Sequence, residues 1–327
     1  MICGAPEGAD AMALAQIGAA TPNTILHVAR DESRLIAMAQ ALAFFAPGMD
    51  AVILPPWDCL PYDRVSPNGE VAAQRLEALA RLVASEGGAA PRFVLTTAAA
   101  ALQRMPARKL LAGARQTIAV GARLDPTTLL GYVERHGYRR AGTVREPGEY
   151  AMRGGIIDLF APAVAEPVRL DFFGDTIESI RRFDPLSQRT TGAIEGLQLG
   201  PVSEVMLDND AVTRFRAGYG ALFGVATDDP LYEAVCAGRH HIGMEHWLPL
   251  FHETLETIFD YLPEATISLD HHAQAACDSR LAMIQEHYQA RASGGGGEAP
   301  RCPTSRCSLI DSTSMRPSGR CTLLAGQ

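Results

Sequence analysis

The sequence predicts an α/β protein in which a parallel-sheet domain carries an inserted α+β domain. In the first ~115 residues, short apolar runs alternate with segments of helical periodicity, an order that builds a parallel sheet with helices on both faces. Near Gln116 the pattern changes to closely spaced strands separated by turn residues, which is typical of antiparallel pairing. Mixed, largely helical sequence resumes after Gly200 and Pro201.

The parallel part is predicted from three buried strands and the helices between them. The strands are residues 24–29, 50–54 and 92–97, which are apolar or β-branched and end at polar residues or prolines. Asp31 is placed to cap a helix that runs to Phe45. A second helix is expected over residues 70–84, and an alanine-rich helix is expected to reach about Arg104.

The inserted part is predicted to begin with a helix over residues 126–136 that ends at Gly137. Strands are expected over residues 155–160, 168–173 and 176–183. Gly174 and Asp175 separate the last two strands and form a hairpin turn signal. Helices are expected over residues 210–218 and 273–291.

These changes of pattern divide the chain into four segments. Residues 1–118 form the first part of the parallel domain, 119–202 the inserted domain, and 203–292 the part that completes the first domain. Residues 293–297 read Ser-Gly-Gly-Gly-Gly, a flexible linker. The tail to residue 327 has no apolar periodicity, so we expect it to be disordered.

Composition excludes several classes of protein. The formal net charge is −8, so we expect no broad basic face for nucleic acid. No run of eighteen apolar residues occurs, and Glu7 and Asp10 replace the basic start of a secretory signal. The seven cysteines are scattered without CxxC spacing, which favours a reduced, cytoplasmic protein that contacts no membrane.

We find no motif for catalysis, cofactor binding or metal binding in this chain. A phosphate loop needs a lysine after glycine, but the only lysine is Lys109, and the glycine-rich start carries Glu7 and Asp10. This chain is therefore not expected to hydrolyse ATP. Gly243, Trp247 and Pro249 interrupt the spacing of the histidines at 240, 241, 246 and 252, so packing roles are favoured over a metal site.

Four longer strings carry the strongest signal. They read WDCLPYDRVSP at 57–67, GEYAMRGGIIDLF at 148–160, RLDFFGDTIESIRRFD at 169–184 (followed by SQRT at 187–190), and GMEHWLPLF at 243–251. In this order they resemble the N-terminal, UvrB-homology module of the bacterial transcription-repair coupling factors (Mfd). The resemblance covers about residues 1–291, and the missing phosphate-loop lysine favours a coupling factor over UvrB itself.

The resemblance implies a degenerate helicase-like domain (1a and 1b) and an inserted domain 2 that binds UvrA, the damage-recognition ATPase of excision repair. Arg153, Arg169 and Phe173 match the family's contact residues. Two arginines beside one aromatic ring are a plausible interaction hot spot. From the residues alone, the alternative is that Arg169 pairs with Asp171 or Glu178 within a charged hairpin while Phe173 packs in the core.

Full-length members of the family also bind RNA polymerase and DNA, and they translocate on DNA with ATP and Mg²⁺ in motor domains that cannot fit after residue 291. The chain therefore resembles a truncated member, expected to be a monomer, and its tail reads as an out-of-frame extension. Two alternatives remain: a UvrB-like, nucleotide-dependent enzyme that binds damaged DNA, and a nonfunctional truncated product.

Overall fold

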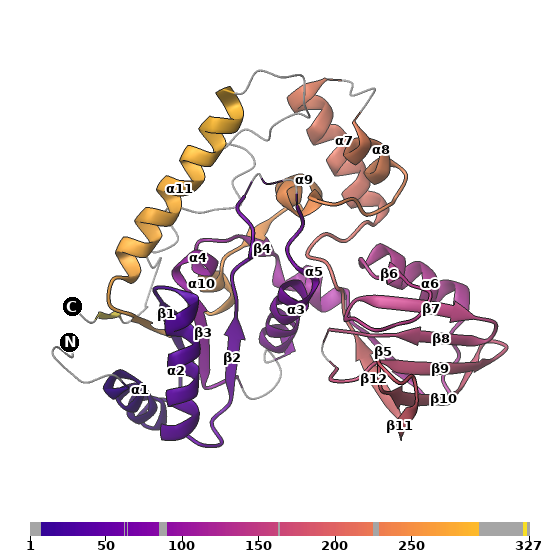
Figure 1. The fold of residues 1–327 in the computed structure, drawn as a ribbon, viewed down its shortest axis with the longest axis horizontal. Helices are drawn as coiled ribbons and strands as arrows, with labels where there is room; N and C mark the ends of the chain where they lie inside the picture. Colours follow the sequence, from indigo (N-terminus) through magenta and orange to yellow (C-terminus); the bar gives the residue numbers. More distant parts are fainter. Residues whose placement is uncertain are drawn as a thin grey trace. The chain divides into compact units, whose positions relative to one another are not determined.

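The computed structural model describes residues 8–61, 63, 65–84, 90–162, 164–224, 229–293 and 323–325. The chain forms two compact units. The first comprises residues 1–62, 81–108 and 254–327, and the second comprises residues 63–80 and 109–253. Each unit has its own sheet (Figure 1).

A parallel sheet forms the centre of the first unit. Its strands are β1 (Ile25–Ala29), β2 (Ala51–Leu54), β3 (Phe93–Thr97), β14 (Thr266–Leu269) and β15 (Leu323–Ala325), in the order β15-β14-β1-β3-β2. The three strands predicted from the sequence are confirmed. The sequence did not predict β14, which pairs with β1 from about 240 residues further along the chain. The sequence predicts a disordered tail up to residue 327. Apart from β15, the residues of this tail lie outside the described part of the chain.

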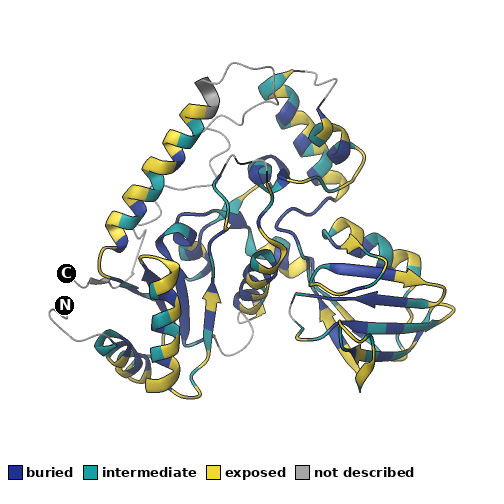
Figure 2. Ribbon diagram, viewed as in Figure 1, coloured by how far each residue is buried: buried dark blue, intermediate teal, exposed yellow. Residues whose placement is uncertain are grey.

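Helices α1 (Ala9–Ala20) and α2 (Glu32–Phe45) pack together against this sheet (Figure 1). Leu14, Met38 and Leu42 belong to one buried cluster with Ile25 and Phe93 of the strands. In Figure 2 the central strands are dark blue, whereas the outer side of α2 is largely yellow. Helix α2 therefore buries one side only.

Local sequence explains how these two helices begin and pack. The Asp31 carboxylate accepts a hydrogen bond from the Arg34 amide at 2.8 Å and so caps α2, as predicted. On α1, a Cβ atom at Gly18 would lie 2.5 Å from Cζ of Phe93. Only a residue without a side chain allows α1 this close to the sheet.

Shorter elements complete the first unit. These are α4 (Ala98–Ala101), β4 (Met105–Pro106), β13 (Leu255–Glu256), α10 (Ile258–Tyr261) and α11 (Ala273–Ser293). The predicted alanine-rich helix ends at Ala101 rather than Arg104, because the chain turns there to pair β4 with β13.

The second unit contains a mixed six-stranded sheet. Its strands are β6 (Arg139–Arg140), β7 (Glu149–Arg153), β8 (Ile156–Leu159), β9 (Val168–Phe173), β10 (Thr176–Phe183) and β11 (Thr190–Ile194), in consecutive order. The sequence pattern predicted antiparallel pairing, with strands over residues 155–160, 168–173 and 176–183. That prediction is wrong at one edge, where β6 runs parallel to β7 because a loop, not a tight turn, joins them.

Helix α6 (Pro126–Arg135) and the strand pair β5 (Gln116–Ala119) and β12 (Gly196–Leu199) contribute to the core under this sheet. Leu129 and Val133 of the helix are buried with Leu170 and Ile180 of the sheet. The remaining helices are α3 (Gly69–Ala84), α5 (Arg108–Gly113), α7 (Asn209–Phe223), α8 (Pro230–Cys236), the 3₁₀ helix η2 (Met244–Trp247) and α9 (Leu248–Phe251).

Candidate functional site

The six-stranded sheet has a buried face and an opposite face, here called the outer face. Along β9, Val168 and Leu170 are fully buried in the core cluster, whereas the alternate residues Arg169 and Asp171 are half-buried. Successive side chains of a strand point to opposite sides of the sheet. Arg169, Asp171 and Phe173 therefore lie together on the outer face, as their spacing predicts.

Two tight turns bring Arg153 and Phe173 to the same end of the outer face. Gly154 and Gly155 join β7 to β8, and Gly174 with Asp175 joins β9 to β10. Gly154 and Gly174 have φ angles of 61° and 62°, a backbone conformation that suits glycine. We call this the hairpin end of the sheet.

Phe173 is 75% exposed at the hairpin end. It is the last residue of β9 and lies opposite Thr176, the first residue of β10. The alternative interpretation that it packs in the core is wrong, because the core side of this strand end is occupied by Phe172. An aromatic ring this exposed is a common feature of protein interaction surfaces.

Arg169 forms a two-pronged ion pair with Asp158 on the neighbouring strand β8. Its Nε and Nη2 atoms donate hydrogen bonds of 2.7 and 2.8 Å to the two carboxylate oxygens. The guanidinium also lies 4.8 Å from the centre of the Phe183 ring. Hydrogen bonding to Asp158 raises the pKa of Arg169 above its ordinary value.

The alternative partners considered from the sequence are therefore wrong for Arg169. Asp171 instead accepts hydrogen bonds from Arg181 and from the Ser179 hydroxyl, the latter at 2.6 Å. The pairing register explains this choice, since Asp158 lies directly opposite Arg169, whereas Asp171 lies beside Ser179. The predicted charged hairpin is present, but Arg169 pairs with Asp158, and Asp171 pairs with Arg181.

Arg153 is exposed at the end of β7. It donates hydrogen bonds to the carbonyl of Gly142 and, at 3.2 Å, to the hydroxyl of Thr143. Both acceptors are uncharged, and among the described residues Arg153 takes part in no ion pair. Its positive charge is therefore less compensated than that of Arg169.

Sequence reasoning missed two residues of this surface. Asp158, which holds Arg169, has only 5% of its side chain exposed. Ile156 is half-buried on the outer face, directly between Arg153 and Asp171 in the pairing register. The alternation Ile156, Asp158, Phe160 could have placed both residues on this face, but only the register shows what lies opposite them.

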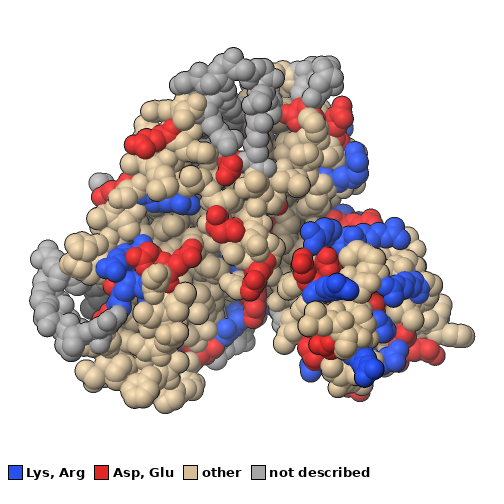
Figure 3. Space-filling model, in the orientation of Figure 1, with Lys and Arg blue, Asp and Glu red and all other residues tan. Residues whose placement is uncertain are grey.

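Charges of both signs are interspersed over the second unit in the view of Figure 3. The opposite end of the outer face is closed by a small apolar cluster of Val144, Ala151, Phe160 and Phe183. At the hairpin end the outer face presents the Phe173 ring, the partly exposed Ile156 and the arginine Arg153, beside the exposed ion pair of Arg123 with Asp175. This arrangement suits protein binding better than acid–base chemistry.

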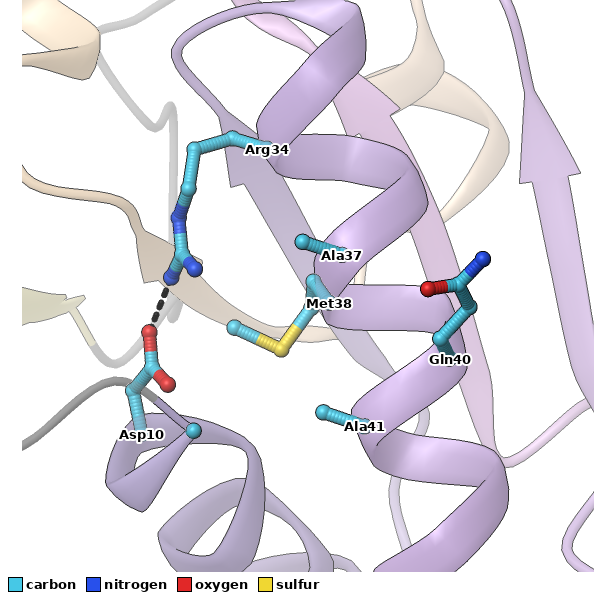
Figure 4. A pocket seen from close by; sticks show the side chains of 7 residues that line it. Asp10, Arg34, Ala37, Met38, Gln40 and Ala41 are labelled. Carbon is cyan, nitrogen blue, oxygen red and sulfur yellow. Dashed lines mark hydrogen bonds and ion pairs between the residues drawn. The ribbon is translucent and has the colours of Figure 1, made fainter.

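A pocket of about 370 Å³ lies in the first unit, between the start of α1 and helix α2 (Figure 4). Arg34 is paired there with Asp10, and its Nε atom is 3.2 Å from Asp270. The Arg34 guanidinium is thus already bound by two carboxylates, Asp10 in the pocket and Asp270 beside it, and is not available to bind a phosphate. The expectation that this unit does not hydrolyse ATP stays a prediction.

The histidines make packing contacts with backbone carbonyls. His246 Nε2 lies 2.9 Å from the carbonyl of Val65, and His252 Nε2 lies 2.8 Å from that of Glu204. In the described part of the chain, no three His, Cys, Asp or Glu side chains are grouped to hold a metal ion. No described helix is both long and apolar enough to cross a membrane.

Residues 117–204, which include the six-stranded sheet, match the UvrB interaction domain family. The second unit therefore contains a domain of this class, and the candidate surface lies within it. The match begins and ends within two residues of the segment 119–202 expected from the change in sequence pattern.

The chain as a whole also has longer relatives. It is 36% identical to the transcription-repair-coupling factor of Haemophilus influenzae over 265 residues, which are 80% of this chain and 23% of that relative. The corresponding protein of Myxococcus xanthus is 35% identical over 271 residues, and that of Escherichia coli K12 is 33% identical over 261 residues. The chain is thus homologous to the N-terminal part of transcription-repair-coupling factors. It spans about a quarter of the length of these relatives.

Proposed function

We propose that this chain recruits UvrA in transcription-coupled nucleotide-excision repair, through the hairpin end of its six-stranded sheet. The exposed ring of Phe173 is the observation that carries the proposal, because it lies on the same face as Arg153 within the UvrB interaction domain. A binding role is also supported by the relatives' name, which joins transcription to repair.

The proposed organisation is a helicase-like domain formed by residues 1–118 and 203–292, with residues 119–202 inserted as the UvrA-binding domain. The pairing of β14 with β1 supports the return of the chain to the first sheet after the insertion. Residues 203–253, by contrast, belong to the second compact unit. In this proposal the first sheet is a scaffold without its own ATPase activity. The pairing of Arg34 with Asp10 and Asp270, which occupies the guanidinium nearest the pocket, supports the absence of ATPase activity.

RNA polymerase binding and ATP-dependent translocation on DNA are proposed only for the longer proteins of this family. For this chain we propose partner binding without ATP, Mg²⁺ or DNA. Phosphate release by the purified chain, measured with and without DNA, tests this statement. ATP turnover above that of a buffer control would contradict it and favour a UvrB-like enzyme.

Calorimetric titration of the chain with purified UvrA tests the proposed function. Phe173→Ala is expected to weaken binding by at least ~2 kcal/mol, as for the centre of an interaction hot spot. Leu186→Ala is the matched control, because Leu186 is 83% exposed but lies beyond the far end of β10. Absence of binding by the folded wild-type chain would refute the proposal.

A further inference from the structure

We propose that the hairpin end recognises an apolar pocket flanked by a single carboxylate on the partner, with Ile156 as an additional contact. This inference rests on the proposed function and specifies the chemistry of the partner's surface. It assigns different roles to the two arginines of the outer face. Arg153 binds the partner's carboxylate, whereas Arg169 is a positioning residue.

On the outer face, Arg169 and Arg181 are paired with carboxylates of the same face, whereas Arg153 makes no such pair with a described residue. Asp158 takes two donor groups of Arg169, and its own side chain is almost entirely buried. Asp171, 19% exposed, is paired with Arg181 through one donor group. Since these two pairs are internally neutral, a second or third acidic group on the partner would gain little here and would lose its hydration.

Arg153 differs because its described hydrogen bonds go to uncharged oxygens. These hydrogen bonds hold the guanidinium beside the loop between β6 and β7 and do not neutralise its positive charge. A partner carboxylate at this position gains a charge-assisted hydrogen bond, about twice as strong as a neutral one. Arg153 is therefore the arginine of this face at which a partner carboxylate gains most.

The apolar contact is formed by Ile156 and Phe173 together. Ile156 is paired directly with Asp171, and Phe173 follows two residues later on the same strand and face. Diagonal neighbours in a sheet are within reach of an aromatic side chain. The two side chains thus form one short apolar strip between the turns at Gly154 and Gly174.

The register also fixes the spacing of the two features. Arg153 and Phe173 are two strands apart and offset by two residues along the strand, so their Cα atoms are separated by about 12 Å. The complementary surface should hold its carboxylate at a similar distance from the pocket that receives the ring.

The test is titration of the full chain with UvrA at about 50 and 300 mM salt. Ile156→Ala is expected to weaken binding about tenfold at both salt concentrations. Arg153→Gln is expected to weaken it about tenfold at low salt and only about threefold at high salt, and to remove most of the salt dependence. Leu186→Ala and Arg189→Gln, two exposed positions outside this end, should leave affinity unchanged.

The outcomes separate this inference from the proposed function. If the wild-type chain does not bind UvrA, both the proposed function and this inference are refuted. If Phe173→Ala weakens binding while Ile156→Ala and Arg153→Gln behave like their controls, the proposed function stands and the inference is overturned. Salt dependence that survives in Arg153→Gln would also overturn it, because other arginines would then contact the partner. Circular dichroism of each variant checks that the fold is intact.

Discussion

Replacing Arg169 by methionine should destabilise the sheet of the second unit rather than simply remove a binding contact. Methionine keeps the unbranched stem that packs near Phe183, but it has no group to donate to Asp158. The Asp158 carboxylate, 5% exposed, would then be buried without its cation. Burying a charge without a partner is costly, because neither water nor protein compensates it.

The size of the effect follows from the two hydrogen bonds that are lost, of 2.7 and 2.8 Å. Hydrogen bonds to charged groups contribute about 1.5–3 kcal/mol each, and breaking a fully buried pair costs about 3–5 kcal/mol. Because 21% of the Arg169 side chain remains exposed, we expect about 3 kcal/mol, near the low end of this range. Adding Asp158→Asn should recover about 1–2 kcal/mol, since the unpaired charge is removed.

Hydrogen exchange of peptides from β8 and β9 measures this effect in the full chain, where two units make a single unfolding midpoint hard to interpret. A loss of about 3 kcal/mol raises the opening equilibrium roughly a hundredfold. Arg189→Met, at an exposed position, is the control and should stay within about 0.5 kcal/mol of wild type. If Arg169→Met exchanges like this control, the ion pair does not stabilise the sheet and our reasoning is refuted.

Three further predictions concern stability. Arg75→Met should cost about 3–5 kcal/mol in the second unit, because Arg75 is fully buried and 2.7 Å from the Glu204 carboxylate; urea unfolding measures it. Gly137→Ala should cost about 3 kcal/mol by the same assay, since Gly137 has φ +90° and a Cβ there would lie 2.6 Å from Cβ of Ser203. Burial lowers the pKa of His27 from 6.5 to about 4, so protonation favours the unfolded state and the stability of the first unit falls as the pH drops from 6.5 towards 4. At pH 5 this loss is about 2 kcal/mol, and His27→Gln should reduce the loss of stability of the first unit between pH 7 and 5 by this amount.

Each of these predictions has an outcome that contradicts it. Arg75→Met with an unchanged urea midpoint would mean that the buried pair contributes no net stability. Gly142→Ala is the control for the glycine change, because its added Cβ would meet open space; equal effects of the two substitutions would exclude the proposed steric cause. Unfolding of His27→Gln that remains as sensitive to acid as wild type would assign the sensitivity to other groups.

Local sequence was a good guide wherever neighbouring residues decide the structure. The cap at Asp31, the end of α6 before Gly137 and the turn at Gly174 depend on backbone preferences and on contacts a few residues apart. The alternation of β9 likewise placed Arg169 and Phe173 on one face. Each of these predictions is confirmed by the structure.

Long-range pairing was harder to predict from the chain alone. Strand β14 is short and follows a helical segment, so its sequence gives no sign that it will join β1. The parallel pairing of β6 with β7 involves only two residues on one strand. Such pairings depend on which edge of a sheet remains open after the other elements have packed.

The sequence by itself determined the class of fold, three strands and one hairpin turn of the inserted domain, and the resemblance that singled out Arg153, Arg169 and Phe173. Only the tertiary structure decided what these residues can do. Strand register placed Asp158 opposite Arg169, left the charge of Arg153 uncompensated among the described residues, and exposed the ring of Phe173. The physical reason is that a side chain's partner and its access to solvent depend on residues from other strands, which local sequence preferences do not specify.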